Sequence, residues 1–462
     1  MKSIREAYIK FTAEIGIPLE KIFGRFWWYS LIHEKNTAIS DVYHSICTDN
    51  RIENYNLFDA FCDALFKYLS FIARYLIFFK FIREIKEKEL IVTYADSLSI
   101  ISTLKTEENK YMYVPQKHDW KEVKKEKDCY VIDNFLSIFD FLYVLLLYLK
   151  ITFLFIVYRD FIKIIFAISA FKVISENGIY ELCKKDLYRS FAGDVLIEGI
   201  FYDRIFNRIS KKIKNKKLDK KIIYVFEGRA WEKALCYHFS KSGYFIEKVG
   251  MVCSAVSDNN LQFFYHYIDV SRMPLPELIG VPGEILKEKF SEIYDEPSIF
   301  IYDSNKSFLW GASPLVGIQK LNKLLLVLGA NDKQNLELLQ FVKDTYFKNI
   351  AVKIHPCSKL MVKEIGLEIE DKLILYGKAA IIAVSSTVTL DALSYGLPTI
   401  VPQLKHYVDF IPIDNDYKGQ QFCYRVNDAK EFFEALSIIE NIKLDRYICE
   451  EYIEKYFFHG RK

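Results

Sequence analysis

Side chains that can bind phosphate follow two short apolar runs in the C-terminal third of the chain. One run ends at His355, and the other ends at Ser385, Ser386 and Thr387, here called the hydroxyl trio. A histidine can hydrogen-bond to a phosphate oxygen or act as a general acid toward a departing phosphate. Hydroxyl groups at a strand exit can cap the next helix, whose first N–H groups attract anions. The two runs therefore predict a site for a phosphate-bearing ligand.

Each of these residues also has a purely structural interpretation. His355 can hydrogen-bond to nearby backbone, and the hydroxyl trio can act only as helix caps. Three hydroxyl residues in a row nevertheless exceed what one cap requires. Lys353 precedes His355 by two residues and so shares its side of the strand. We expect Lys353 either to line the same site or to form a salt bridge.

A carboxylate occupies the corresponding position in the N-terminal half, where a strand run ends at Glu227. A carboxylate at a strand exit can act as a general base toward a hydroxyl group, whereas the alternative is a solvated turn residue. Gly228 allows a sharp turn, and Arg229 can hold a phosphate or carboxylate with two hydrogen bonds. Glu232 falls on the first turn of the next helix, where it either serves the helix dipole or contacts a ligand.

Apolar runs of strand length alternate with helical segments in both halves of the chain. This alternation is typical of parallel sheets that helices cover on both faces, so the sequence predicts an α/β fold. Ligands bind such sheets beyond the carboxyl ends of the strands, where Glu227 and His355 fall. The runs that we assign to strands are residues 90–96, 221–226, 244–250, 299–302, 324–328, 350–354, 379–384 and 397–401.

The same pattern divides the chain into four regions. Residues 1–90 are expected to be helical, with an aromatic cluster at 26–36 that serves as a core or as a domain contact. Two Rossmann-like domains follow, and a segment with glycine and proline at 304–320 reads as the linker between them. The domains are expected to comprise residues 90–312 and 320–440, followed by a helical tail at 441–462.

Residues 135–171 form an unusually apolar helical insertion in the first of these domains. Charged residues interrupt it, so no stretch of about 20 residues is free of charge, which weakens the case for a spanning helix. Three interpretations remain open: a buried helical insertion, an interfacial or re-entrant membrane element, and a true span. A lysine-rich stretch at 211–221 is either a solvated face or a contact for anionic lipid.

Composition and missing motifs exclude several classes of protein. The 462 residues carry a formal net charge of +3, which gives no case for a general nucleic-acid binder. The nine cysteines are scattered without metal-ligand spacing, and the start lacks the apolar core of a signal peptide, so we expect a cytoplasmic protein. No phosphate-loop, dinucleotide or nucleophile-elbow motif is present, and no Asp-x-Asp pair indicates a metal.

On the residues above, the chain resembles GT-B glycosyltransferases. More narrowly, it looks like bacterial surface-carbohydrate biosynthesis proteins related to sialyltransferase-like and Kdo-transferase-like enzymes. His355 with Pro356 resembles the HP motif of that group, and the hydroxyl trio resembles its Ser/Thr-rich motif; both motifs contact the phosphate of the donor. Glu227 with Gly228 resembles the element whose acid is the catalytic base. The segments 27–36 and 231–235 are also similar to this group.

The resemblance covers residues 222–402 and implies two Rossmann-like domains that face a cleft. It implies a metal-independent glycosyltransferase without a cofactor, which moves a sugar, such as a CMP-activated acidic sugar, from a nucleotide donor. The acceptor would be a surface polysaccharide or a lipid-linked glycan, bound by the N-terminal domain, with the donor on the C-terminal domain. Arg229 and Glu232 would contact the acceptor or the donor sugar. The expected location is the inner face of the cell membrane, with peripheral contact through residues 135–171 and 211–221.

Two other functions remain open at this point. A polyol-phosphate transferase of the teichoic-acid type also uses two Rossmann-like domains and a similar histidine. A catalytically degenerate GT-B protein could act as a scaffold in glycan assembly, because residues 250–254 hold no histidine where the resemblance leads us to expect one.

Overall fold

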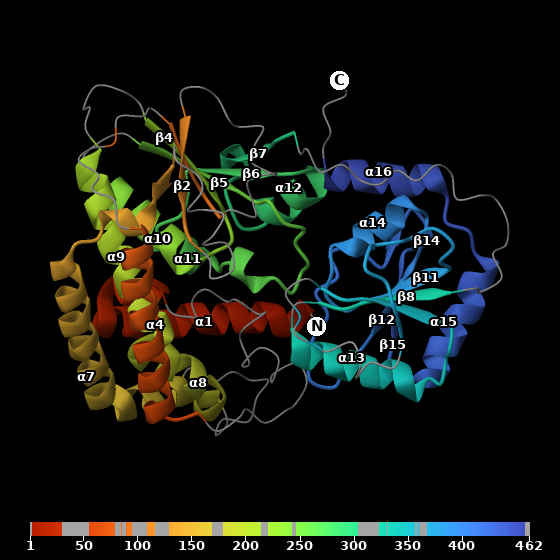
Figure 1. Ribbon diagram of the computed structural model, residues 1–462, viewed down its shortest axis with the longest axis horizontal. Helices are drawn as coiled ribbons and strands as arrows, with labels where there is room; N and C mark the ends of the chain where they lie inside the picture. The colour runs from red at the N-terminus through yellow and green to blue at the C-terminus, as the bar shows by residue number, and fades with distance from the viewer. Residues whose placement is uncertain are drawn as a thin grey trace.

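Two parallel β-sheets with helices packed around them form the framework of the chain (Figure 1). The computed structural model describes residues 2–29, 55–78, 85, 89–94, 109–115, 129–168, 179–213, 220–242, 246–303, 323–329, 331–355, 358, 360 and 367–457. The segment 304–320, which we interpreted as the linker, lies outside these residues, as do residues 30–36 and Pro356.

The N-terminal sheet has seven strands in the order β3-β2-β1-β4-β5-β6-β7, and every pairing in it is parallel. The chain builds outward from β1 to β3, then crosses back and continues from β4 on the other side of β1. This is the strand order of a Rossmann domain, in which ligands bind where the order reverses, between β1 and β4. The strands are β1 (Glu89–Thr93), β2 (Asn109–Tyr113), β3 (Tyr130–Val131), β4 (Lys220–Val225), β5 (Ile246–Met251), β6 (Leu278–Val281) and β7 (Ile299–Ile301).

The C-terminal sheet repeats this plan with six strands in the order β10-β9-β8-β11-β12-β15, again all parallel. Its reversal point lies between β8 and β11, which are direct neighbours. The strands are β8 (Leu324–Val327), β9 (Ile350–Lys353), β10 (Glu368–Ile369), β11 (Ala380–Ile382), β12 (Thr399–Pro402) and β15 (Cys423–Val426). A separate hairpin joins β13 (Asp416–Tyr417) to β14 (Gln420–Gln421).

Contiguous apolar residues form the central strands of both sheets because helices exclude water from both faces. Every residue of β8 and of β11 is buried. The structure confirms the predicted α/β class with two Rossmann-like domains. Strands β8 and β11 end one and two residues, respectively, before the predicted boundaries. The helices of the C-terminal half are α13 (Asp332–Asp344), α14 (Val388–Ser394), α15 (Ala429–Asn441) and α16 (Arg446–Tyr456).

The N-terminal helices pack into the core of the first domain. They are α1 (Lys2–Phe23), the short 3-10 helix η1 (Gly24–Tyr29) and α4 (Leu57–Phe78). Trp27 and Tyr29 of η1 are almost fully buried, which confirms the core interpretation of the described part of the aromatic cluster. Arg25 forms hydrogen bonds of 2.7 and 3.0 Å to the carboxylate of Asp203, which also accepts one from the Tyr29 hydroxyl.

A helical insertion separates β3 from β4 and contains α7 (Ile138–Ile168), α8 (Ile179–Ala192) and α9 (Asp194–Lys212). Among the described helices, α7 is the one that is long and apolar enough to cross a membrane, by length and composition, over Ile138–Phe166. One face of α7 packs in the core and the opposite face is exposed, so the helix is not buried throughout. Further helices of this domain are α10 (Ala230–Ser240), α11 (Tyr267–Val270) and α12 (Glu284–Ser291).

The last helix, α16, returns to the N-terminal domain and ties the two domains together (Figure 1). The Tyr456 hydroxyl bonds to the main-chain nitrogen and oxygen of Val256, at 2.9 and 3.0 Å. At Gly283, which precedes α12, an added Cβ would lie 2.4 Å from main-chain oxygens of α16. The absence of a side chain there allows α12 and α16 to approach closely.

Candidate functional site

A sharp turn at the exit of β4 presents Glu227 at the reversal point of the N-terminal sheet. Gly228 adopts φ +73°, a conformation that favours glycine. An added Cβ there would lie 2.6 Å from the main-chain oxygen of Gln262 and 3.0 Å from the Tyr265 hydroxyl. Both the backbone conformation and the lack of space for a Cβ therefore require glycine at position 228. The turn leaves the Glu227 side chain partly exposed.

Glu232, the third residue of α10, holds this turn from inside. Its carboxylate accepts hydrogen bonds from the Glu227 nitrogen at 3.0 Å and from the Gly228 nitrogen at 2.9 Å. Burial first, and then the Glu227 charge, raise the pKa of Glu232 well above its ordinary value. Because its side chain is only 2% exposed and bonds to backbone, the geometry favours a role in shaping the turn.

Three further side chains lie around Glu227. The Arg229 Nε lies 3.4 Å from a Glu227 carboxylate oxygen. At the exit of β1, the Tyr94 hydroxyl accepts a 2.6 Å hydrogen bond from the Trp231 indole of α10. At the exit of β5, burial and the nearby Glu227 charge raise the pKa of the Cys253 thiol to about 12. Cys253 thus occupies the segment where we expected a histidine, and only the strand order, not the sequence, reveals its position beside Glu227.

The reversal point of the C-terminal sheet brings Gly329, after β8, against Ser385, after β11. A Cβ added to Gly329 would lie 3.2 Å from the Ser385 main-chain oxygen. The side chain of buried Asn335 fixes Gly329 by bonding to both its nitrogen and its oxygen at 2.8 Å. These contacts give the first loop of the domain a rigid position beside the hydroxyl trio.

The hydroxyl trio is partly exposed and only partly used within the fold. Ser386 Oγ accepts a 3.1 Å hydrogen bond from the nitrogen of Val388, the first residue of α14, whose N-cap residue is Thr387. Ser385 is half-buried and Thr387 is exposed. Because α14 has only seven residues, the hydroxyl groups rather than the helix dipole distinguish this strand exit. Gly396 follows the helix with φ +70°, a conformation that favours glycine at a helix end.

His355 follows β9, on the other side of β8 from the hydroxyl trio. Exits separated by two strand spacings lie roughly 10 Å apart. The ring is partly buried, and burial lowers the pKa of His355, so the neutral imidazole is favoured. Its loop is tied to the start of α13, because Ser358 Oγ donates a 2.5 Å hydrogen bond to the Asp332 carboxylate. The structure thus gathers the exits of β8, β9 and β11 along one edge.

Lys353 turns away from this group. Its Nζ donates a 2.5 Å hydrogen bond to the main-chain oxygen of Asp371, which follows the edge strand β10. In the sheet, β10 lies beyond β9, on the side opposite to β8 and β11. The structure therefore does not bring Lys353 to the hydroxyl trio.

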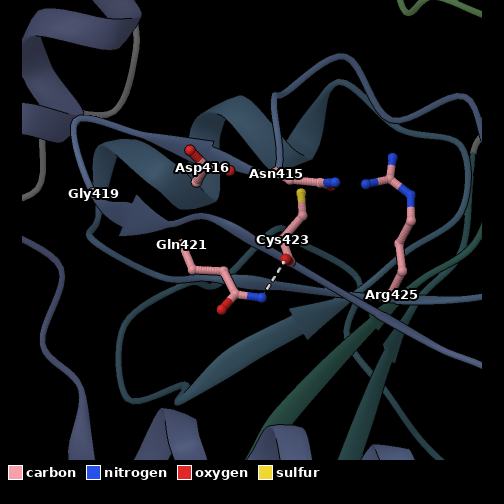
Figure 2. Close-up of a pocket in the computed structure, with 6 residues that line it drawn as sticks. All are labelled: Asn415, Asp416, Gly419, Gln421, Cys423 and Arg425. Atoms are coloured by element: carbon pink, nitrogen blue, oxygen red, sulfur yellow. Dashed lines mark hydrogen bonds between the residues drawn. The ribbon is translucent and has the colours of Figure 1, made fainter.

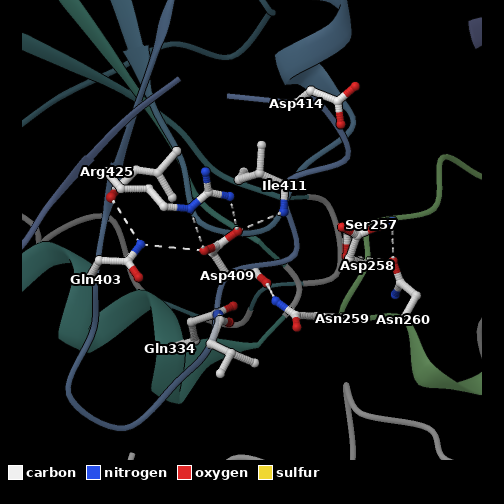
Figure 3. Close-up of polar contacts among 12 residues, drawn as sticks. Ser257, Asp258, Asn259, Asn260, Gln334, Gln403, Asp409, Ile411, Asp414 and Arg425 are labelled. Atoms are coloured by element: carbon white, nitrogen blue, oxygen red, sulfur yellow. Dashed lines mark hydrogen bonds and ion pairs between the residues drawn. The ribbon is translucent and has the colours of Figure 1, made fainter. Parts of the chain in front are cut away.

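The loop at residues 403–411, here called the Asp409 loop, connects this edge to the N-terminal domain (Figure 3). Its Phe410 nitrogen donates a 2.7 Å hydrogen bond to the Val384 oxygen, directly before the trio. The Asp409 main-chain oxygen accepts a 2.7 Å hydrogen bond from Asn259, in the loop that follows β5 and Cys253. The buried Asp409 carboxylate in turn bonds to Arg425 and Gln403. No sequence motif marks this contact.

An open pocket of about 620 Å³ lies beside the hairpin of the C-terminal domain (Figure 2). Arg425 contributes to it, so the pocket adjoins the Asp409 network, but none of the predicted site residues lines it. Its lining residues are Asn415, Asp416, Gly419, Gln421, Cys423 and Arg425. Across the described part of the chain, no group of three or more His, Cys, Asp or Glu side chains is arranged to hold a metal ion.

No family model and no curated protein sequence matches the chain. Solved structures do match in their arrangement. The lipopolysaccharide outer core galactosyltransferase WaaB is 12% identical over 81% of this chain and 96% of its own, with a TM-score of 0.41. The UDP-GlcNAc 2-epimerase of Methanocaldococcus jannaschii, solved with UDP-GlcNAc and UDP, is 14% identical over 80% of this chain and 99% of its own, with a TM-score of 0.41. A glycotransferase of kitacinnamycin is 11% identical over 81% and 95%, with a TM-score of 0.40.

The architecture itself follows from the strand orders. All strands in both sheets are parallel, and in both sheets the chain crosses back after the third strand and continues on the other side of the first. The strand-exit loops of the two domains meet at Asn259 and Asp409. The C-terminal helix α16 closes the arrangement on the first domain. The chain therefore has an α/β fold of the GT-B type, with two Rossmann-like domains, an N-terminal helical region and an apolar helical insertion.

Proposed function

We propose that this protein is a metal-independent glycosyltransferase that moves a sugar from a nucleotide donor to a surface polysaccharide or lipid-linked glycan. One observation carries the proposal: the strand exits of the two Rossmann-like domains meet, through the hydrogen bond between Asn259 and the Asp409 loop. Ligands of such domains bind at these exits. A donor on one domain and an acceptor on the other would therefore meet at this junction.

On the donor side, we assign the phosphates to Ser385, Ser386 and Thr387, with His355 across Gly329. The start of α13 suits an anion less well, because Asn331 already caps it and the Asp332 carboxylate lies there. A sugar nucleotide lying over Gly329 could reach both the trio and the imidazole. Since Lys353 bonds to the Asp371 carbonyl instead, we leave it out of this group.

On the acceptor side, we assign the general base to Glu227. Its carboxylate takes the proton of an acceptor hydroxyl, whose oxygen forms a bond to the anomeric carbon of the donor sugar. As that bond forms, the bond from the anomeric carbon to the nucleotide phosphate breaks, and the phosphate leaves with its electron pair. Arg229 is placed to orient the carboxylate or a sugar hydroxyl, and Glu232 acts as a positioning residue behind the turn.

The resemblance of the His355 and hydroxyl-trio segments to enzymes of acidic sugars suggests a CMP-activated sugar as the donor. A panel of CMP- and UDP-sugars, scored first by thermal shift and then by nucleotide release, tests this choice. Stabilisation by a CMP compound would support a CMP-sugar donor, and stabilisation by UDP compounds alone would indicate a UDP-sugar donor instead. A phosphodiester in the product would favour the polyol-phosphate transferase, and no binding at all would favour the scaffold.

Matched substitutions test the roles of the residues. Glu227→Gln should lower kcat by about 100-fold or more while the donor still binds, since only the base is lost. Glu247→Gln is the control, because Glu247 pairs with Lys221 in the same sheet and away from the strand exits. Equal turnover in both variants would remove Glu227 as the base.

The donor side has its own pair of variants. Ser386→Ala and His355→Ala should each weaken donor binding by roughly tenfold, the loss of one charge-assisted hydrogen bond. Ser394→Ala, at the other end of α14, is the control, because its hydroxyl donates a 2.6 Å hydrogen bond to the Asp391 carbonyl of the same helix. Wild-type donor affinity in both site variants would overturn this assignment.

A further inference from the structure

Two neighbouring helices expose many apolar side chains in the described part of the structure. On α7 these are Leu142, Leu146, Leu149 and Phe153, and on α4 they are Phe58, Leu65, Leu69 and Leu76; we call them the α4/α7 surface. The ring contacts of Phe61 with Tyr148 and of Tyr68 with Phe141 place the two helices side by side (Figure 1). Leu146 is 59% exposed and Phe153 is 65% exposed.

On each of the two helices, the exposed apolar residues are spaced so that they form a continuous stripe along the helix. On α4 the positions 58, 65, 69 and 76 recur at helical intervals, and the charged Lys67 and Arg74 lie on the opposite side. On α7 the apolar stripe runs from Ile138 to Val157, a length of roughly 30 Å. A helix that is apolar all round is buried in a core or in a membrane. Here only one face of α7 meets the core.

The packed face of α7 argues against a spanning helix. Asp140, which is fully buried, forms ion pairs with Arg204 and Arg208 of α9. Farther along, the hydroxyls of Tyr148 and Thr152 donate hydrogen bonds to carbonyls at the end of α8, at 2.6 and 3.1 Å. A span would break these contacts and leave buried charges without partners. The helix stays attached along this face, so a bilayer can reach only the outer one.

Charge around the surface indicates what covers it. Lys150 is exposed on α7 beside the stripe, and Arg208 of α9 donates a 3.0 Å hydrogen bond to Ser137, directly before α7. Arg159, Asp160 and Lys163 interrupt the apolar face of α7 near its end, with Lys163 3.5 Å from the Asp160 carboxylate. Exposed cations that border an elongated apolar stripe match anionic headgroups around an acyl layer. They match a second copy of the same cationic rim less well.

We propose that the α4/α7 surface rests on the anionic face of a lipid bilayer, with α4 and α7 lying in the interface. The proposal goes beyond the transfer reaction, because it concerns none of the residues assigned to donor or acceptor. It also selects the interfacial interpretation of residues 135–171. A protein bound in this way would act on acceptors that are held at the membrane.

Vesicle flotation of the full-length protein tests this docking. Binding to phosphatidylcholine vesicles with about 30% phosphatidylglycerol is expected to exceed binding to phosphatidylcholine alone, and to weaken as salt rises. Leu146→Asp and Leu69→Asp should each lower the partition constant by about tenfold or more, because one buried leucine is replaced by a charge. Leu336→Asp, at a similarly exposed leucine of α13, is the control and should bind like wild type.

Further measurements separate the alternatives. Lys150→Glu should weaken binding to the anionic vesicles only, and unchanged melting temperatures should show that each variant is folded. Equal vesicle binding by Leu146→Asp and wild type would overturn the proposal. So would a dimer in light scattering that Leu146→Asp disperses while no vesicle is bound, and so would resistance to alkaline extraction, which indicates a span. Transfer to a water-soluble acceptor should be unchanged in Leu146→Asp, so that failure of the docking and failure of the transferase function are distinguishable.

Discussion

The Asn259 side-chain amide donates a 2.7 Å hydrogen bond to the main-chain oxygen of Asp409, across the junction between the two domains. The next residue, Phe410, bonds to Val384, which immediately precedes the hydroxyl trio. The hydroxyl trio is thus linked by hydrogen bonds to the loop that follows Cys253 in the N-terminal domain. In the proposed transferase, a change in the relative position of the two domains would therefore change the geometry of the donor site.

Asn259→Ala should loosen this coupling. One hydrogen bond contributes about 1 kcal/mol, so donor affinity is expected to fall by roughly fivefold, with little change in overall stability. Isothermal titration with the donor nucleotide measures the effect. Asn441→Ala, at the exposed end of α15, removes an amide that donates a hydrogen bond to the Ser437 carbonyl of the same helix and should leave affinity unchanged. Equal affinities in the two variants would show that the junction does not position the donor site.

Glu232 should reveal itself by a pH dependence of stability. Because burial raises its pKa in the folded protein, the folded state binds the proton more tightly than the unfolded state. Its contribution to the free energy of unfolding therefore falls as pH rises above the ordinary value of about 4.5. Glu232→Gln keeps one acceptor for the turn and lacks this titration. We expect the difference in melting temperature, variant minus wild type, to become more positive from about pH 5 to about pH 8.

Glu232→Ala provides the comparison for that experiment. It removes both acceptors, so the Glu227 and Gly228 nitrogens lose their partner and stability should fall at every pH by roughly 1–3 kcal/mol. A melting-temperature difference for Glu232→Gln that is flat with pH would show that the carboxyl does not titrate abnormally.

His355 should change its pKa when the donor binds. Burial holds it below the ordinary value in the free protein, whereas a nearby phosphate favours the charged imidazolium and raises the pKa. By linkage, donor affinity should increase as pH falls between the pKa of the free protein and that of the complex. NMR titration of the imidazole, identified by its absence in His355→Gln, measures both values. If the pKa of His355 is the same with and without donor, His355 does not contact the donor phosphates.

The sequence predicts this site only in part, because many of its contacts join residues that lie far apart in the sequence. Apolar runs such as Leu324–Val327 identify strands because both faces of the sheet are buried. Asn109–Tyr113 mixes polar and aromatic residues, and Tyr130–Val131 is only two residues long, so neither strand was predicted. Without them the full strand order, and with it the reversal point at Glu227, could not be deduced.

The contact between Asn259 and Asp409 spans 150 residues and has no local pattern at either end. The turn at Gly228, by contrast, was predictable, because a glycine at a strand exit has a local physical cause. The direction of Lys353 was not, since its partner is the main-chain oxygen of Asp371, in the loop after the edge strand β10.

Asp203 should govern the acid stability of the N-terminal domain. Burial alone would raise its pKa, but hydrogen bonds from His238 and Arg25 outweigh burial and lower the pKa to about 2. A lowered folded pKa contributes stability above the unfolded value of about 3.8, roughly 2 kcal/mol here, and that contribution is lost as pH falls toward the folded value. Asp203→Asn should therefore lower the free energy of unfolding at pH 7, and its deficit should shrink as pH falls through that window.

Denaturant unfolding at a series of pH values measures this deficit. Asp344→Asn, which changes an exposed carboxylate near the end of α13, is the control and should track wild type throughout. Because Arg25 and Tyr29 belong to the same 3-10 helix, loss of the carboxylate should also release η1 from α9 and expose Trp27. A red shift of tryptophan fluorescence before global unfolding is expected in Asp203→Asn alone. A deficit that stays constant down to acid pH would mean that packing of the aromatic residues, rather than the carboxylate charge, holds this helix in place.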